Sequence, residues 1–340
     1  MAHTPALEDA GLSMTRLRIE VAHGDALAFK ADVLALKFAQ AAHGVDALAA
    51  ESLRRARREV RYPKVWKSVI VDATSSSPVG KVLFMGVPTL HAFGYREIRR
   101  FGREVLESLH ELAPGVEHLA ITVHGPGYGL DEAEAFESEI AGFSDAVREG
   151  MFPASLRLIT VVESNKKRAD RLTTLLSELL IGGMLTGPAL GTGRKPKPIP
   201  DERLRSAGYG SESKGHVFVA MPFKDEMEDV FHFGIRKPVR TAGLLCERAD
   251  LSAFTGDVLE WVRTRIKTAS LVVADLTDAN PNVYLEVGYA WGCGVPTVLL
   301  VRDSQELKFD VRGQRCLIYK KIKDLEAMLR TELAGLKRKS

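Results

Sequence analysis

The sequence predicts an α/β protein made of two doubly wound α/β/α modules, each with helices on both faces of a largely parallel sheet. Strand-like apolar runs alternate with amphipathic helix-like segments along most of the chain, and such alternation favours parallel sheets covered on both faces. A stretch rich in Gly, Pro, Ser and Lys interrupts this alternation between Ile181 and Gly215, after which it starts again. The length of 340 residues also favours two domains over one.

The first module is expected over residues 15–182. Its strand-like runs are RLRIEVAHGD, ADVLALKF, SVIVDA, KVLFMGV, HLAITVHG and LRLITVVES. A helix is predicted over 95–112, where apolar residues recur at helical spacing: Ile98, Phe101, Val105 and Leu109. Further helices are predicted over 43–60, 131–149 and 165–180. The helix over 131–149 opens on Asp131 and Glu132, and acidic side chains suit the positive end of a helix.

The stretch 183–214 is predicted to be an interdomain linker, because its composition cannot bury much apolar surface. The second module is expected over residues 215–335. It opens with the strand HVFVAMPF and a helix over about 225–241, followed by a short strand over 244–249 and a helix over 257–268. The strand LVVADL, the loop TDANPN, a helix over 282–293 and the strand TVLLV complete a second β-α-β-α-β pattern.

Composition excludes several classes of function. The net charge is only +3, from 47 basic and 44 acidic side chains, so no concentrated basic face is expected and neither DNA nor RNA is an expected partner. The three cysteines are widely spaced and form no metal-binding motif, so we expect reduced thiols and no metal. No secretory signal and no apolar run of about 20 residues is present, so a cytoplasmic location without membrane contact is expected.

A carboxylate in the second module is the first candidate for catalysis. Ligands bind beyond the carboxyl ends of strands in open parallel sheets, and both AMPF and DLTDANPNVYLEVGYA follow such ends. Glu286 lies there, near the start of an otherwise apolar helix. Burying a carboxylate costs several kcal/mol unless it is paired or functional. From the residues alone, a catalytic role and a hydrogen-bonding role in the first helical turn are equally supported.

The segments VFVAMPF and ADLTDANPNVYLEVGYAWGCGVPTVLLV resemble the nucleoside 2-deoxyribosyltransferase-like superfamily, which includes sequences described as TIR-like nucleotide-binding proteins. The likeness extends through FDVRGQRCLIY and covers about a third of the chain. It implies a flavodoxin-like fold. It also implies that Glu286 either attacks the anomeric carbon of an N-glycoside or, as in TIR enzymes, is required to cleave the nicotinamide–ribose bond of NAD.

The same resemblance implies substrate-binding roles for residues at several strand ends. These are Ala220, Met221, Phe223, Asp257, Asp275, Asn280 and Asn282. Asp257 could instead cap its helix. The family's sugar-binding aspartate has no acidic counterpart here, since Asn280 or Asn282 occupies its region, and this departure favours a ribosyl substrate such as NAD. The resemblance implies no metal and no cofactor other than NAD as a substrate.

A glycine-rich loop, HGPGYG, follows a strand and precedes a helix in the first module. Its backbone N–H groups could surround an anion, although glycines also serve ordinary turns. Together with GDALAFKADVLAL, this loop resembles the macro domain and the macro-like domain of leucyl aminopeptidases. The likeness implies binding of ADP-ribose or a similar nucleotide through Asp25, Asp32, His124, Gly125, Gly127, Tyr128 and Gly129, with Asp32 at the adenine.

Two alternatives remain open in that loop and strand. His124 could equally be hydrogen-bonded to neighbouring backbone. LKFAQ stands where the macro family has an asparagine pair, and this favours binding of the nucleotide over its hydrolysis.

The leading hypothesis is a two-domain sensor–effector, expected to form a homo-oligomer. A macro-like domain would bind a small nucleotide signal, and the TIR-like domain would then act as a hydrolase of an N-ribosidic bond, an NADase. Such pairings are similar to bacterial antiviral defence effectors that deplete NAD. One alternative is an N-glycosidase or ribosyltransferase of nucleoside salvage. The other is a non-catalytic nucleotide-binding adaptor in which Glu286 is structural.

Overall fold

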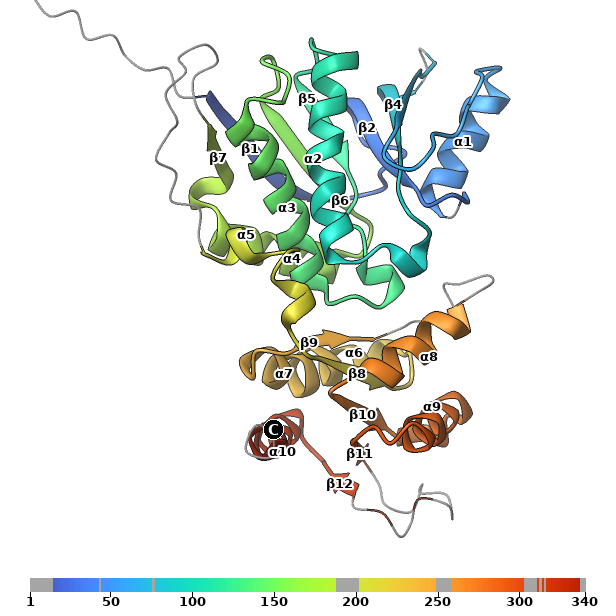
Figure 1. Cartoon of the computed structure of the whole chain (residues 1–340), viewed down its shortest axis with the longest axis vertical. Coiled ribbons are helices and arrows are strands. Elements are labelled where there is room, and N and C mark those ends of the chain that lie inside the picture. The colour runs from blue at the N-terminus through green and yellow to red at the C-terminus, as the bar shows by residue number, and fades with distance from the viewer. Residues whose placement is uncertain are drawn as a thin grey trace, which may run out of the picture. The chain divides into compact units, whose positions relative to one another are not determined.

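The computed structural model describes residues 15–42, 44–74, 77–187, 202–248, 258–302, 311, 314 and 316–336 (Figure 1). The chain divides into two compact units. The first comprises Met1–Thr89, Glu97–Val123 and Phe136–Ala207, and the second comprises Leu90–Arg96, His124–Ala135 and Gly208–Ser340. The first turns of two long helices, α2 (Tyr95–Leu112) and α3 (Glu132–Glu149), are therefore grouped with the second unit.

The first unit contains a seven-stranded sheet in the order β3-β4-β2-β5-β6-β1-β7. Its strands are β1 (Thr15–His23), β2 (Ala31–Phe38), β3 (Ser68–Asp72), β4 (Val79–Gly86), β5 (His118–Ile121), β6 (Leu158–Glu163) and β7 (Met184–Gly187). The five inner strands run parallel to one another, whereas β3 and β7 are antiparallel to their neighbours at the two ends of the order. The predicted α/β class is thus confirmed here.

Helices cover this sheet because its strands are apolar on both sides. On one face, Leu34, Leu36 and Phe84 pack against Ala49 and Leu53 of α1 (Val45–Arg55). The remaining helices of this unit are α2, α3, α4 (Lys166–Leu179) and α5 (Glu202–Ser206).

The helices α2 and α3 pack closely through two glycines. A Cβ at Gly102 would lie 2.7 Å from the Glu139 carbonyl oxygen, and one at Gly142 would collide with the Arg99 carbonyl. Only glycine therefore fits at these two crossing points.

The second unit contains five parallel strands in the order β12-β11-β10-β8-β9. They are β8 (His216–Ala220), β9 (Leu245–Glu247), β10 (Leu271–Asp275), β11 (Thr297–Val301) and β12 (Cys316–Ile318). Numbered from β8, this order is 2-1-3-4-5, the flavodoxin-like order that was expected.

Alternate residues of these strands face two helical layers. Phe218 and Ala220 pack toward α8 (Val258–Thr268) and α9 (Pro281–Gly292), whereas Val217 and Val219 face the opposite side. That opposite side is covered by α10 (Ile322–Leu336) and by a helical run over residues 225–241.

The run over 225–241 is a helix as predicted, but it is not uniform. It consists of α6 (Asp225–Asp229), a π-helical segment (Val230–Arg236) and α7 (Lys237–Thr241). A Cβ at Gly234 would lie 2.7 Å from Leu325 Cδ2, so this glycine lets α10 lie directly against the π-helical segment. The sequence analysis did not predict the π-helical segment within this helix.

The stretch expected to be a linker is more ordered than its composition suggests. Residues 184–187 form β7, which pairs with β1, and residues 202–206 form α5. Leu185, Leu204 and Ala207 are all buried, so the described residues at the two ends of this stretch bury more apolar surface than its composition indicates. Residues 188–201 of that stretch lie outside the described part of the chain.

Two predicted elements end earlier than expected. The helix predicted over 43–60 ends at Arg55, close to Arg57, whose φ of 58° lies in the left-handed region that a helix does not use. The strand predicted over 118–125 ends at Ile121, and a 3-10 turn (Pro126–Tyr128) follows. In the ranges given above, no helix is long and apolar enough to cross a membrane.

Candidate functional site

The order of the five-stranded sheet reverses between β8 and β10, where ligands usually bind in doubly wound folds. The loop after β8 carries Met221, Phe223 and Lys224, and the loop after β10 carries Asp278. The Lys224 ammonium lies 2.8 Å from the Asp278 carboxylate, which joins the two loops by an ion pair. The sequence-based reasoning missed Lys224, although its place after a strand end was visible.

The loop after β10 is held by its own polar side chains. Asp275 is fully buried and accepts hydrogen bonds from the Tyr319 hydroxyl (2.6 Å) and the Thr277 amide (3.0 Å). Burial and the neighbouring Asp275 carboxylate raise the pKa of Tyr319. Asp278 and Ala279 both have left-handed φ angles, 63° and 50°, which non-glycine residues rarely adopt. The loop is thus strained at the candidate site, where strain often accompanies function.

The two asparagines expected to bind substrate have different environments. Asn280 caps α9, and its side-chain oxygen accepts a hydrogen bond from the Asn282 amide at 3.0 Å. The Asn282 side chain is exposed. Asp275 and Asn280 therefore shape the loop, while Asn282 is the one available to a ligand.

Glu286 lies in the second turn of α9 and is partly buried. Burial raises the pKa of its carboxyl from 4.5 to about 7. Within the described ranges it makes no hydrogen bond or ion pair, so no cation offsets this desolvation. The carboxyl is therefore poised to change protonation state near neutral pH, which is the range that acid–base and nucleophilic chemistry uses.

The loop after β8 is arranged around an arginine that the sequence analysis missed. Ala220 and Met221 are buried, whereas Phe223 is 38% exposed. The Arg248 guanidinium carbon lies 4.8 Å from the centre of the Phe223 ring, and Arg248 Nη1 lies 3.8 Å from the Met221 sulfur. Arg248 directly follows β9, so its position at a strand end was again the available signal. Asp257, also expected to bind substrate, lies outside the described residues.

The glycine-rich loop adopts a conformation that needs two of its glycines. Gly125 and Gly129 have φ angles of 103° and 90°, which side chains other than glycine strongly disfavour. A Cβ at Gly127 would meet no atom within 4 Å, so this position is open. His124 is buried with its ring edge-on to Phe93, at 6.4 Å between centroids. Although the loop follows β5 closely in the chain, the segment His124–Ala135 belongs to the second unit.

Asp25 and Asp32 are not brought together. Asp25 follows the carboxyl end of β1, and its Oδ1 accepts the Leu27 amide at 2.9 Å. Asp32 lies near the amino end of β2, where Oδ2 accepts the amides of Glu117 and His118, both at 2.9 Å. Because ligands bind at the opposite, carboxyl edge of such sheets, the geometry gives Asp32 a structural role at the start of β5.

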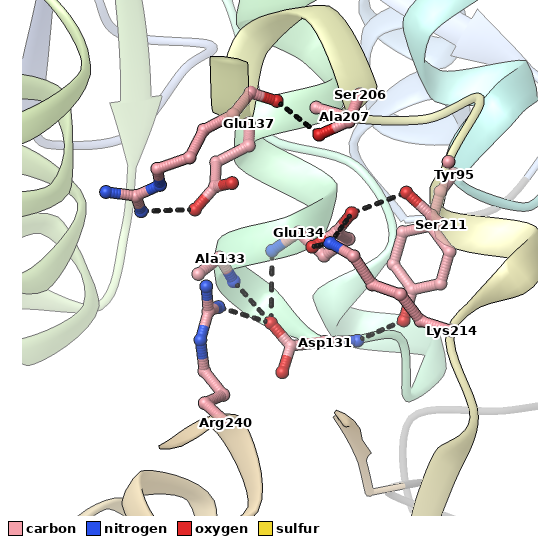
Figure 2. A network of polar contacts seen from close by, with 12 residues as sticks. Tyr95, Asp131, Ala133, Glu134, Glu137, Ser206, Ala207, Ser211, Lys214 and Arg240 are labelled. Atoms are coloured by element: carbon pink, nitrogen blue, oxygen red, sulfur yellow. Dashed lines mark hydrogen bonds and ion pairs between the residues drawn. The ribbon is translucent and has the colours of Figure 1, made fainter. Parts of the chain in front are cut away.

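A buried polar cluster surrounds the start of α3 (Figure 2). Asp131 is 1% exposed, and its Oδ1 accepts the amides of Ala133 and Glu134, both at 3.0 Å, as a helix cap does. The same oxygen accepts a hydrogen bond from Arg240 at 2.8 Å. Glu134 accepts hydrogen bonds from the Lys214 ammonium (2.7 and 2.8 Å) and from Ser211. The acidic start of α3 is therefore paired inside the second unit.

No protein-family model and no curated protein sequence matches this chain. Solved structures that resemble it include the CMP N-glycosidase BcmB of Clostridium botulinum, at TM-score 0.30 and 21% identity, over 34% of this chain and 98% of that one. They also include a macrodomain of Oceanobacillus iheyensis with MES bound, at TM-score 0.36 and 15% identity, over 49% of this chain and 97% of that one.

A mutant of the same macrodomain with ADPR matches at TM-score 0.33 and 13% identity, over 48% of this chain and 98% of that one. These TM-scores are too low to bear on function. The α/β class rests on the two sheets themselves.

Proposed function

We propose that the second unit hydrolyses an N-ribosidic bond, with NAD as the favoured substrate and Glu286 as the catalytic carboxylate. The observation that carries this proposal is the state of Glu286. Its carboxyl has a pKa of about 7, makes no polar contact within the described residues, and lies on the helix that follows β10, where the strand order reverses. A desolvated carboxylate at such a place needs a positive partner, and the ligand can supply it.

The chemistry of NAD fits that requirement. In NAD the glycosidic nitrogen belongs to a cationic nicotinamide ring, and positive charge moves to the ribose as the C1′–N bond breaks. The bond electrons leave with nicotinamide, which becomes neutral. An ionised Glu286 would stabilise the ribosyl cation or bond to C1′, after which water supplies the hydroxyl and releases a proton.

The charge of the substrate also favours NAD over a neutral nucleoside. A cation next to a carboxyl group lowers the pKa of that group, so bound NAD would convert Glu286 to its active, ionised form. A neutral nucleoside brings no such charge, and its base would need protonation before it leaves. The raised pKa of Glu286 in the free protein is thus compatible with activity at neutral pH.

We also propose that the glycine-rich loop over residues 124–129 binds ADP-ribose or a similar nucleotide that acts as a signal. The loop turns at two left-handed glycines, Gly125 and Gly129, and between them the exposed and open position of Gly127 allows a diphosphate to approach. Asp25 stays a candidate contact, whereas Asp32 does not. A role in antiviral defence follows from the resemblance to bacterial effectors that deplete NAD.

The test is to incubate the full-length protein with NAD, CMP or free nucleosides, with and without ADP-ribose, and to measure the released base. Glu286→Gln should abolish release from NAD, and Glu260→Gln, a matched change at an exposed carboxylate on α8, should not. Release from nucleosides alone would instead indicate a salvage enzyme. No release under any condition would indicate a nucleotide-binding adaptor and contradict the proposal.

A further inference from the structure

The outermost strand β9 of the five-stranded sheet has its free side occupied by the last residue of the glycine-rich loop and the two residues that follow it. The amide of Leu245 donates toward the β8 side, to the Gly215 carbonyl. Because amides alternate in direction along a strand, those of Cys246 and Arg248 point the other way. The Cys246 amide donates to Asp131 Oδ2 at 3.1 Å, and the Arg248 amide donates to the Gly129 carbonyl at 3.0 Å. Residues 129–131 thus lie where a sixth strand would pair.

Side chains also hold residues 129–131 against β9. Tyr95 accepts a hydrogen bond from the Asp131 amide at 2.8 Å and donates one to Glu247, also at 2.8 Å. Glu247 is fully buried, and its two carboxylate oxygens accept hydrogen bonds from Arg265 Nε and Nη2, both at 2.6 Å. All these residues belong to the second unit. Each of the two buried carboxylates is paired with an arginine: Asp131 with Arg240 and Glu247 with Arg265. The position of residues 129–131 along β9 is therefore closely determined.

Arg248 connects this pairing to the loop after β8. Its backbone amide contacts Gly129, while its guanidinium lies 3.9 Å from the centre of the Phe231 ring and 4.8 Å from that of Phe223. Its Nη2 donates to Glu228 at 2.7 Å, which helps to hold the planar group close to both rings. Burial opposes ionisation of Glu228, but His232 and Arg248 outweigh it and lower its pKa to about 2, so the Glu228–Arg248 pair stays charged across ordinary pH.

We propose that Arg248 is a positioning residue that links the glycine-rich loop to Met221 and Phe223 at the proposed catalytic edge. A ligand that displaces Gly129 moves the backbone of Arg248, and the guanidinium carries that movement to the Phe223 ring. Phe223 is the exposed aromatic residue of the loop after β8, so its position helps to set the shape of the substrate side of that loop. The inference rests on the proposed function only in taking that loop as part of the catalytic edge.

The link can be tested without activity and without a ligand. The protein has eight methionines, and ¹³C-methyl methionine NMR of the full chain would report on Met221 directly, with its signal assigned by Met221→Leu. Asp131→Asn perturbs the pairing of residues 129–131 with β9 at the Cys246 amide, away from Arg248. Tyr95→Phe perturbs the same pairing more mildly and replaces Asp131→Asn if that variant fails to fold. Each is compared in the wild-type background and together with Arg248→Gln.

The proposal predicts that Asp131→Asn shifts the Met221 signal by more than its linewidth, and that this shift disappears in the Arg248→Gln background. Met328 on α10 serves as the control signal and should stay in place. Arg248→Lys keeps the charge that faces Glu228 but has no planar face for the two rings, so it should not restore the shift. A Met221 shift in both backgrounds, or in neither, overturns the proposal.

Adding ADP-ribose separates this inference from the proposed function. If ADP-ribose binds, it should shift the Met221 signal in the wild type and not in Arg248→Gln. If calorimetry shows that ADP-ribose does not bind at all, the proposed signal is wrong, and the variant comparison above still decides the role of Arg248.

Discussion

Asp131 and Arg240 form an ion pair at 2.8 Å although they are 109 positions apart in the chain. Asp131 is almost completely buried, and it also caps α3 and accepts the Cys246 amide. One carboxylate therefore serves as a helix cap, as half of an ion pair and as the partner of an outermost strand. Removing it would leave several backbone amides without their acceptor and would take one anionic partner from the partly buried Arg240 guanidinium.

Asp131→Ala is accordingly expected to lower the stability of the protein by about 2–3 kcal/mol, because buried backbone amides lose a charged acceptor. Urea or guanidinium unfolding followed by circular dichroism would measure it. The control is Asp170→Ala, which removes the exposed i,i+4 pair with Lys166 and should cost less than about 0.5 kcal/mol. Equal effects of the two substitutions would contradict the role given to Asp131.

Glu286→Gln is expected to stabilise the protein at pH 8 and not at pH 5. The folded-state pKa of about 7 exceeds the ordinary value of 4.5, so this carboxyl favours folding when protonated, and its contribution is lost as pH rises from 4.5 through 7. Above pH 7 the buried charge costs up to roughly 3 kcal/mol. Gln carries no charge at any pH and avoids that cost.

Melting temperatures of wild type and Glu286→Gln from pH 5 to pH 8.5 would show this difference, with Glu260→Gln as the matched variant that should follow the wild type. A Gln variant that is less stable than the wild type at pH 8 would mean that the carboxylate has a stabilising partner and a structural role.

The catalytic activity should depend on the ionisation of Glu286 as well, and it should rise with pH where the stability falls. The nucleophilic form is ionised, so kcat/KM for NAD hydrolysis is expected to fall about tenfold per unit as pH drops below the pKa of about 7. Glu286→Gln should reduce the rate on the order of 10³-fold or more. A kcat/KM that is independent of pH between 5 and 8, or an active Gln variant, would rule out Glu286 as the nucleophile.

Gly127→Val is expected to block nucleotide binding by the glycine-rich loop without unfolding the protein. A Cβ there meets no atom within 4 Å, so the fold tolerates a side chain, but the side chain would occupy the space that a diphosphate needs. Isothermal titration with ADP-ribose would measure the loss. Gly115→Val is the matched control, because a Cβ at Gly115 also meets nothing within 4 Å and lies outside the loop. Unchanged affinity in Gly127→Val would place the ligand elsewhere.

Much of the fold could be predicted because local patterns determine it. The helix over 95–112 and the strands over 31–38 and 297–301 begin and end at the predicted residues, since their apolar spacing is regular and their ends are marked. The strand β7 was missed because a strand of four residues between glycines, Met184–Gly187, has no periodicity of its own. It exists because β1 offers it a free edge, which is a tertiary cause.

In the candidate site, too, local patterns predict some features, whereas contacts between distant segments determine others. The positions of Met221 and Phe223 after the end of β8, and of Glu286 on the helix that follows β10, follow from the order of strands and helices. The pairing of the acidic start of α3 could not be foreseen, because its cations Lys214, Arg236 and Arg240 come from segments about 80 to 109 residues away. Arg248 was missed for a related reason: its two aromatic neighbours are 17 and 25 residues distant in the sequence, with no periodic relation to it.

The place of β1 in its sheet affects the synthesis of the protein. Both neighbours of β1 come late in the chain, β6 at residues 158–163 and β7 at residues 184–187. At ordinary ribosome speeds, β1 waits about ten to thirty seconds for these partners to emerge. During that time its apolar residues, Leu17 and Ile19 among them, are open to chaperones and to neighbouring nascent chains. A fragment that stops at residue 182 would supply β6 but never β7, so one edge of β1 would stay unpaired permanently.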